Sequence, residues 1–203
     1  MSRLQKSVWL SVLLALAAGS TNTKGTEMTN DSDMQAMLQR WQDACTPGPA
    51  HEKLSPFVGK WDTITRVWMA GPDQPPAESK GTSETSWWAD QRWLQTSSEG
   101  EMMGQPERGH GVMGYDNYKK KYVATWVTST TTALLSMEGG FDQSGKTLIL
   151  YGLMDEPMTG EHDKVVKYIW RLDNPDRIVF EVHDLPIGET KTKVIEMVYT
   201  RRK

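Results

Sequence analysis

Short segments rich in apolar, β-branched and aromatic residues, several of them alternating with polar residues, recur along the chain beyond residue 54. They cover 62–69, 82–88, 92–98, 109–115, 122–127, 133–138, 147–153, 165–172, 177–183 and 191–201. This pattern predicts about ten β-strands. Short polar turns join them and no helical segment separates them, which favours an antiparallel barrel or sandwich over a parallel βαβ sheet. We therefore predict one all-β domain over 54–203.

The clearest hairpin lies near the middle of the chain. A strand beginning at Gly109 reaches the turn residues Asp116 and Asn117, and the chain returns through 122–127. Asp-Asn pairs favour tight turns, and the returning segment has the residue types that strands prefer. The glycines at 109, 111 and 114 predict a bulge or a close backbone approach in a curved strand.

The pattern before residue 54 is different. Met34, Leu38, Trp41 and Cys45 recur at helical spacing, and Thr46-Pro47-Gly48-Pro49 follows them. This predicts one amphipathic α-helix over 31–46.

Residues 1–19 have the build of a secretory signal peptide. Arg3 and Lys6 precede an apolar run that ends in small residues, with cleavage expected after Ala17 or Gly19. We expect export to the periplasm or beyond, with no membrane span in the mature chain, because no later segment reaches spanning length. Residues 20–30 lack periodicity and are expected to form a disordered spacer.

The composition narrows the function classes. With 23 Lys and Arg against 26 Asp and Glu, the net charge is -3, and no cationic excess indicates nucleic acid as a partner. The single cysteine, Cys45, excludes an internal disulfide, so the core must stabilise the fold. Nine Trp against three Phe is unusual, and Trp serves cavity walls, strand pairs and sugar-binding platforms alike. The oligomeric state is left open.

Two segments imitate nucleotide-binding motifs. Residues 140–147 match G-x-x-x-x-G-K-[ST], but Lys146 opens a predicted strand where phosphate binding requires a helix, so we predict a hairpin turn over 142–145. Residues 109–114 match G-x-G-x-x-G without a following helix. Neither segment predicts a nucleotide site.

The last three predicted strands suggest a candidate site. If Leu172 pairs with Arg177, and Glu181 opposes Lys193, one face of the sheet holds Tyr168, Trp170, Glu181, Lys193 and Tyr199. A cavity on that face would have an ion pair to orient a polar ligand group. The alternative is a surface cross-strand pair of Glu181 and Lys193. A register error of one residue would exchange the two faces. Trp126 of the central hairpin is a further candidate wall residue.

The four histidines lie far apart in sequence, without the paired spacing of a zinc site. We expect no metal and no resident cofactor. Haem held through His110 or His183 remains as a minor alternative to ordinary hydrogen-bonded histidines.

Two features resemble known families. Gly59-Lys60-Trp61 at the first strand and Arg201 at the last resemble the G-x-W and arginine arrangement of calycin (lipocalin-like) barrels, which implies that Gly59, Trp61 and Arg201 close the barrel, with the guanidinium over the indole. A longer series resembles the bacterial domain of unknown function 1579 family over roughly 54–203. The segments that carry it are 100–104, 114–117, 122–126, 140–148, 155–160, Phe180-Glu181 and 199–201. The resemblance implies a lipocalin-like barrel and no particular activity.

Three functions follow as hypotheses. The first is a non-catalytic protein that binds a small, largely apolar molecule inside the barrel, at Trp126, Tyr168, Trp170, Glu181, Lys193 and Tyr199. The second is a structural or interaction domain of the cell envelope, with a filled barrel and an exposed apolar patch. The third is an enzyme that uses Glu181, Lys193 or a tyrosine as acid or base within a pocket.

Overall fold

The computed structural model describes residues 31–69, 73–185 and 192–203. The predicted signal peptide and spacer, residues 1–30, lie outside the described residues. Helix α2 spans Asp31–Cys45, as the spacing of its apolar residues predicts. The short helix α3 (Pro49–Glu52) and the 3-10 turn η1 (Ser55–Phe57) lead into the first strand. None of the helices in the described part of the chain has the length and hydrophobicity needed to cross a bilayer.

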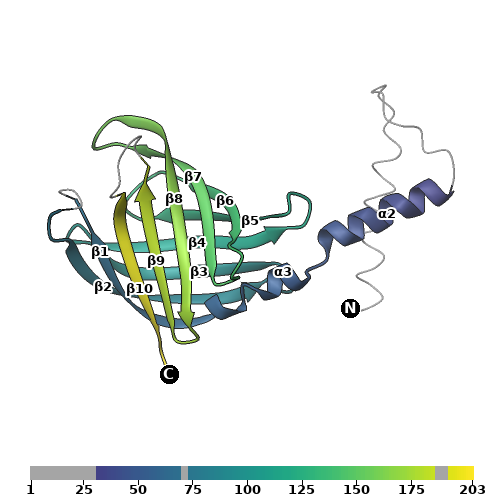
Figure 1. Cartoon of the computed structure of the whole chain (residues 1–203), viewed down its shortest axis with the longest axis horizontal. Helices are drawn as coiled ribbons and strands as arrows, with labels where there is room; N and C mark the ends of the chain where they lie inside the picture. The colour runs from purple at the N-terminus through teal and green to yellow at the C-terminus, as the bar shows by residue number, and fades with distance from the viewer. Residues whose placement is uncertain (1–30, 70–72, 186–191) are drawn as a thin grey trace. The chain divides into compact units, whose positions relative to one another are not determined.

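Ten antiparallel strands form a closed barrel (Figure 1). Each strand pairs with the next along the chain, and the first strand also pairs with the last. The predicted antiparallel barrel of about ten strands is therefore confirmed. The strands are β1 (Gly59–Val67), β2 (Ala77–Trp88), β3 (Trp93–Met102), β4 (Gln105–Asp116), β5 (Lys121–Thr128), β6 (Leu135–Phe141), β7 (Thr147–Glu156), β8 (Glu161–Asn174), β9 (Arg177–Asp184) and β10 (Lys193–Arg201).

Side-chain hydrogen bonds fix the turns predicted from sequence. Between β4 and β5, the Asp116 carboxylate accepts the backbone N–H groups of Tyr118 and Lys119, each at 2.8 Å. Between β6 and β7, Asp142 accepts the Ser144 hydroxyl at 2.7 Å and the Thr147 N–H at 3.2 Å. Strand β7 starts at Thr147, so the phosphate-loop imitation is a hairpin turn, as predicted.

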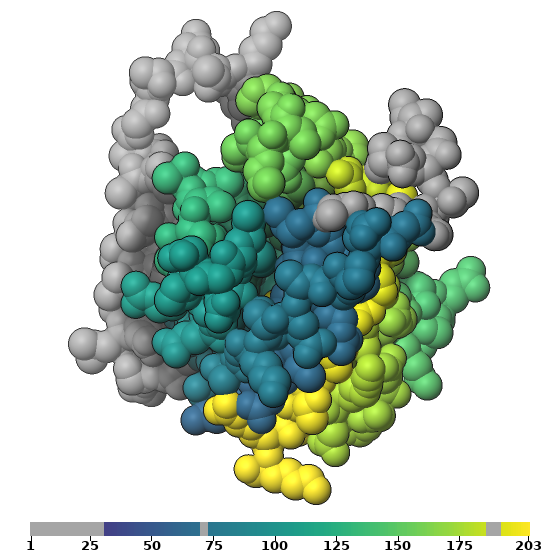
Figure 2. All heavy atoms as spheres, turned by 90° about the vertical axis from the view of Figure 1, so that its left-hand side faces the viewer, coloured from purple at the N-terminus to yellow at the C-terminus, as the bar shows by residue number. Residues whose placement is uncertain are grey.

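The seam between the first and last strands is closed by one arginine. Arg201 lies opposite Trp61 in the β1–β10 register, and its guanidinium carbon is 4.0 Å from the centre of an indole ring. It also donates to the carbonyls of Val58 at 2.7 Å, Pro56 at 2.9 Å and Pro175 at 2.8 Å. In the space-filling view of Figure 2, blue β1 and β2 residues lie beside yellow C-terminal ones. The resemblance to calycin barrels is thereby confirmed at this contact.

Gly59 is required at this end of the barrel. Its φ is +144°, which side-chain-bearing residues rarely adopt, and a Cβ atom would overlap the Arg201 guanidinium. The glycine of the G-x-W tripeptide is therefore sterically required, because it leaves room for the arginine that covers the tryptophan. Trp61 itself is 1% exposed and donates its indole N–H to the Phe57 carbonyl at 3.0 Å.

Candidate functional site

The barrel encloses a cavity of about 460 Å³. Phe57 and Trp61 lie at its closed end, beside the Arg201 contact. It extends to the opposite end of the barrel, where it is lined by residues of the β3–β4, β5–β6 and β7–β8 hairpins, including Met102, Thr130 and Pro157. A volume of this size suits one small molecule.

One wall of the cavity carries hydroxyl groups. Strands β1, β2 and β3 contribute Thr65, Thr85, Thr96 and Ser98. Thr65 and Thr85 are each 7% exposed, and the hydroxyls of Thr85 and Thr96 are 2.9 Å apart. Because each hydroxyl both donates and accepts, this wall offers polar contacts without charge.

The facing strands contribute mainly aromatic and aliphatic side chains. Phe180 lies between two aromatic neighbours, with its ring centre 4.5 Å from that of Trp170 and 6.4 Å from that of Tyr168. The Tyr168 and Phe180 rings are nearly parallel, at 9°. Tyr199 meets Trp61 edge to face at 6.3 Å. These rings give the cavity its apolar surface.

The indole of Trp126 lies flat on the backbone of β4. Cβ atoms built at Gly109 and Gly111 would both overlap its ring. The close approach predicted for these glycines is thus made by a side chain of the neighbouring strand, since Gly111 and Trp126 are partners in the β4–β5 register. Any larger residue at either position would push the indole into the cavity.

Two tyrosines supply hydroxyl groups within the apolar part. Burial raises the pKa of Tyr168 to about 12 and raises the pKa of Tyr199 further. Both phenols are therefore neutral hydrogen-bonding groups at physiological pH. Neither hydroxyl makes a hydrogen bond to another described residue, although Tyr168 is only 4% exposed.

Within the part of the chain that the structure describes, the charged residues that line the cavity are three carboxylates near the hairpins, Glu107, Asp155 and Glu156. Glu107 accepts the Thr130 hydroxyl at 2.6 Å. Asp155 accepts the Asp163 N–H at 3.1 Å and lies 3.2 Å from His162, and these contacts lower the pKa of its carboxyl. We call these three residues the acidic rim.

The predicted site residues divide into two groups. Trp126, Tyr168, Trp170 and Tyr199 line the cavity together. Glu181 and Lys193 do not line it. Cavity-lining Phe180 and Val182 flank Glu181, so strand alternation directs Glu181 to the outer wall. The predicted placement of Glu181 and Lys193 beside the tyrosines is therefore wrong.

The cause is a register error at two irregularities. Leu172 pairs with Ile178 rather than with Arg177, because the β8–β9 register shifts between Leu172 and Asn174. A second shift, between Lys193 and Ile195, turns Lys193 outward while Ile195 faces the cavity. Each bulge adds one residue to a strand and so exchanges the faces beyond it.

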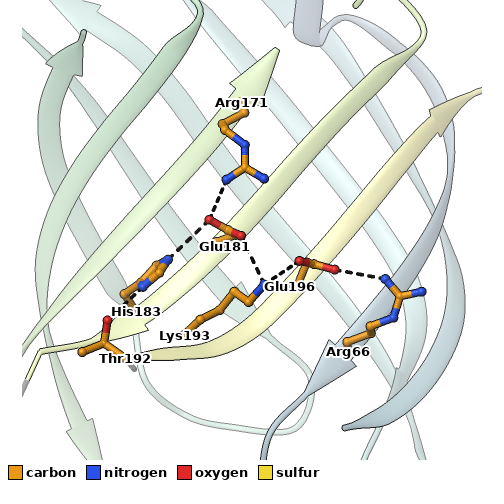
Figure 3. Close-up of polar contacts among 7 residues, drawn as sticks. All are labelled: Arg66, Arg171, Glu181, His183, Thr192, Lys193 and Glu196. Carbon is orange, nitrogen blue, oxygen red and sulfur yellow. Dashed lines mark hydrogen bonds and ion pairs between the residues drawn. The ribbon is translucent and has the colours of Figure 1, made fainter. Parts of the chain in front are cut away.

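On the outer wall, Glu181 belongs to a network of ions (Figure 3). Its carboxylate accepts Arg171 at 2.7 Å, and its oxygens lie 3.4 Å from His183 and 3.3 Å from Lys193. Burial opposes ionisation here, but the hydrogen bond and charge of Arg171, with His183 and Lys193, hold the pKa of Glu181 below its usual value. Glu196 continues the network from Lys193, at 2.7 Å, to Arg66, at 3.0 Å.

The histidines considered for haem lie away from the cavity. His110 is exposed and lies 3.3 Å from Ser97, on the face of β4 opposite to Gly111. His183 is in the outer network. A haem inside the cavity would have neither of them as an axial ligand. Among residues 31–69, 73–185 and 192–203, no three His, Cys, Asp or Glu side chains are grouped so as to hold a metal ion.

Sequence reasoning missed the hydroxyl wall and Phe180. The signal for the wall was present as polar residues two apart, Thr63 with Thr65, Ser83 with Thr85 and Thr96 with Ser98. Such alternating hydroxyls read as an exposed face of a strand, since Ser and Thr are mostly exposed in proteins. Only closure of the barrel shows that they face inward.

A second depression, of about 630 Å³, runs along the outer wall. It is lined by Trp88, Trp93 and residues of β5, β6 and β7, among them Glu138 and Tyr151. Lys119 and Lys121 neutralise Glu138 there. This groove is more open to solvent than the barrel interior, so we take the enclosed cavity as the candidate site.

Comparison with known proteins gives a family and a fold. A family model described as "Protein of unknown function (DUF1579)" matches residues 46–201. No curated protein sequence matches the chain.

Among solved structures, that of Rv2717c from M. tuberculosis has a TM-score of 0.55 and 14% identity, over 78% of this chain and 100% of that one. The S-type phycobiliprotein lyase CPES from Guillardia theta has a TM-score of 0.49 and 12% identity, over 77% and 99%. EF1p2_mFAP2b bound to DFHBI has a TM-score of 0.40 and 11% identity, over 75% and 99%. The first likeness supports the same barrel fold.

Proposed function

The chain belongs to the DUF1579 family, and from its geometry we propose that it binds one small, largely apolar molecule in the barrel cavity. The single observation that carries this proposal is a space of about 460 Å³ inside the barrel, with aromatic side chains on one side and uncharged hydroxyls on the other. Such a space favours binding of an apolar ligand, because the ligand surface is removed from water. The hydroxyls can also form hydrogen bonds with one polar group of that ligand.

The cavity favours this function over the two alternatives. A structural domain would be served by a filled barrel, whereas side chains leave this interior incompletely filled. The enzyme hypothesis relied on Glu181, Lys193 or a tyrosine within a pocket. Glu181 and Lys193 are engaged in the ion network of the outer wall, so they are not available as an acid or base beside a bound molecule. Burial raises the pKa of cavity-lining Tyr168 to about 12, which disfavours its phenol as a base.

Fluorescence titration with N-phenyl-1-naphthylamine tests the proposal. This neutral apolar probe brightens when it leaves water, and we expect saturable binding with one probe per chain. Replacing cavity-lining Ser98 with Phe should weaken binding about tenfold or more, because the ring occupies ligand volume. Ser97→Phe, one residue along on the exposed face of β3, is the matched control and should bind normally. Absence of saturable binding to the native protein would overturn the proposal.

We further propose that the chain is exported from a bacterial cell and acts in the periplasm or outside. The support is the order of residues 1–19, with basic residues, an apolar run and small residues. Expression of the full-length gene followed by fractionation and mass determination tests it. A mature chain beginning at Ala18 or Ser20 in the periplasm or medium is expected, and full-length protein confined to the cytoplasm would contradict export.

A further inference from the structure

We propose that the cavity selects its ligand by charge, so that it takes uncharged molecules with one hydrogen-bonding group and rejects anionic ones such as carboxylates and sulfonates. This inference rests on the proposed binding function and narrows it to a ligand class. It has three independent supports, in the interior, in the tyrosine hydroxyls and in the acidic rim.

Among the described residues, the interior offers no positive charge to receive an anion. Of the described residues that line the cavity, none is Lys, Arg or His. The basic residues on these strands point elsewhere, as Arg171 and Lys193 do, or close the far end, as Arg201 does. An anionic group placed among Trp170, Phe180 and the hydroxyl wall would lose its hydration without gaining an ion pair, and this costs several kcal/mol.

The polar groups inside the cavity suit a neutral partner. The Tyr168 hydroxyl, in a residue 4% exposed, has no protein partner among the described residues and faces the cavity. A hydroxyl, carbonyl or amide of a ligand would supply a hydrogen-bond partner. Because burial raises the pKa of Tyr168 to about 12, this hydroxyl keeps its proton and stays available as a donor.

The acidic rim gives the entrance of the cavity a negative charge, which repels anionic ligands. Glu107, Asp155 and Glu156 all line the cavity, and they come from two of its hairpins. One lysine, Lys164, is close enough to Glu156 for the two charges to interact, but it is shared with two further carboxylates, Asp184 at 2.8 Å and Glu161 at 3.5 Å, so the carboxylates at these hairpins outnumber it. Three carboxylates therefore repel an approaching anion, and they do so strongly next to a low-dielectric wall.

Two probes that differ by one sulfonate test the selection. N-phenyl-1-naphthylamine is neutral, and 1-anilinonaphthalene-8-sulfonate is the same molecule with an anionic group. We expect the native protein to bind the sulfonate at least about tenfold more weakly, in direct titration and in competition against the neutral probe. The ratio of the two dissociation constants is the quantity measured, and it should shrink as salt screens the rim.

Two triple variants with the same change of net charge test whether the selection against the sulfonate comes from the acidic rim. Glu107→Gln with Asp155→Asn and Glu156→Gln neutralises the rim and should bring the two dissociation constants closer together. Glu84→Gln with Asp90→Asn and Glu99→Gln makes the same change of net charge at positions that do not line the cavity, and should leave the ratio as in the native protein.

The outcomes separate this inference from the function beneath it. If neither probe binds, the binding function itself fails. If the sulfonate binds as tightly as the neutral probe, binding stands and charge selection is overturned. If both triple variants change the ratio equally, the rim has no specific role and the effect belongs to overall charge.

Discussion

Arg201 combines two kinds of contact in one side chain. It covers the Trp61 indole, and its three nitrogens donate to three carbonyls near the chain seam. Lysine has neither the planar shape nor the number of donors to replace it. Closure of the barrel at this contact therefore requires arginine at position 201.

We expect Arg201→Ala to lower the free energy of unfolding by about 3 kcal/mol, because a cation–π contact and several charge-assisted hydrogen bonds are lost. Denaturant unfolding measures this. Arg202→Ala is the control, since Arg202 is exposed and pairs with exposed Asp62, and it should cost less than about 1 kcal/mol. Equal losses in the two variants would show that the contact with Trp61 is not special.

His51 makes stability depend on pH. It is 5% exposed, its Nδ1 accepts the Gly48 N–H at 3.1 Å, and burial lowers its pKa below 6.5. The unfolded chain then binds the proton more readily than the folded one, so stability falls as pH decreases below about 6.5. His51→Asn should flatten this part of the profile, whereas Tyr115→Phe, beside the imidazole, should retain it. An unchanged slope in His51→Asn would contradict the assignment.

At the scale of elements, the strands were predictable and their exact pairing was not. Each strand carries its own pattern of residues, and turn residues such as Asp116 and Asp142 mark its ends. A bulge leaves no local mark, because the extra residue at Val194 is a β-branched apolar residue of the kind found throughout regular strands. Because two bulges were not foreseen, Glu181 and Lys193 were predicted on the inner face of the sheet, where they do not lie. Tyr168, Trp170 and Tyr199 were predicted on the inner face correctly.

The outer ion network joins four strands, β1, β8, β9 and β10, across the seam of the barrel. Glu181→Gln should lower the free energy of unfolding by about 2 kcal/mol, because Arg171 and Lys193 lose a largely buried counter-charge. The native advantage over this variant should shrink as the pH falls below 4.5, because the folded state, in which the pKa of Glu181 is lowered, then binds fewer protons than the unfolded chain. Urea unfolding at pH 7 and pH 3 measures both effects.

The control for Glu181→Gln is Glu84→Gln. Glu84 is paired with Lys60 at 3.7 Å on the exposed surface. Its loss should change stability by less than about 0.5 kcal/mol. A result as large as that at Glu181 would show that net charge, and not the network, governs stability.

At the scale of the whole molecule, the barrel was predictable because the G-x-W tripeptide and the last arginine both lie at chain positions that only closure brings together. The cavity was less predictable. Its depth depends on how ten inward faces fill a shared interior, and hydroxyl residues such as Thr85 carry no sign of burial in the sequence.

Residues 42–203 form one compact unit. We expect a fragment 42–203 to unfold cooperatively with the same denaturant midpoint as the full chain. A fragment 42–192 lacks β10 and Arg201, leaves β1 and β9 with unpaired edges, and should neither fold cooperatively nor bind the neutral probe. Circular dichroism during urea unfolding distinguishes the two. Cooperative folding of the shorter fragment would mean that closure is dispensable.

The packing of the Trp126 indole against the glycine backbone of β4 has a practical consequence. Its position is set by two missing methyl groups, one at Gly111, which lines the cavity, and one at Gly109, which does not. Adding a single carbon at Gly109 would therefore change the size of the pocket from behind its wall. A protein engineer, or natural variation, could retune which molecules fit while every contacting side chain stays the same.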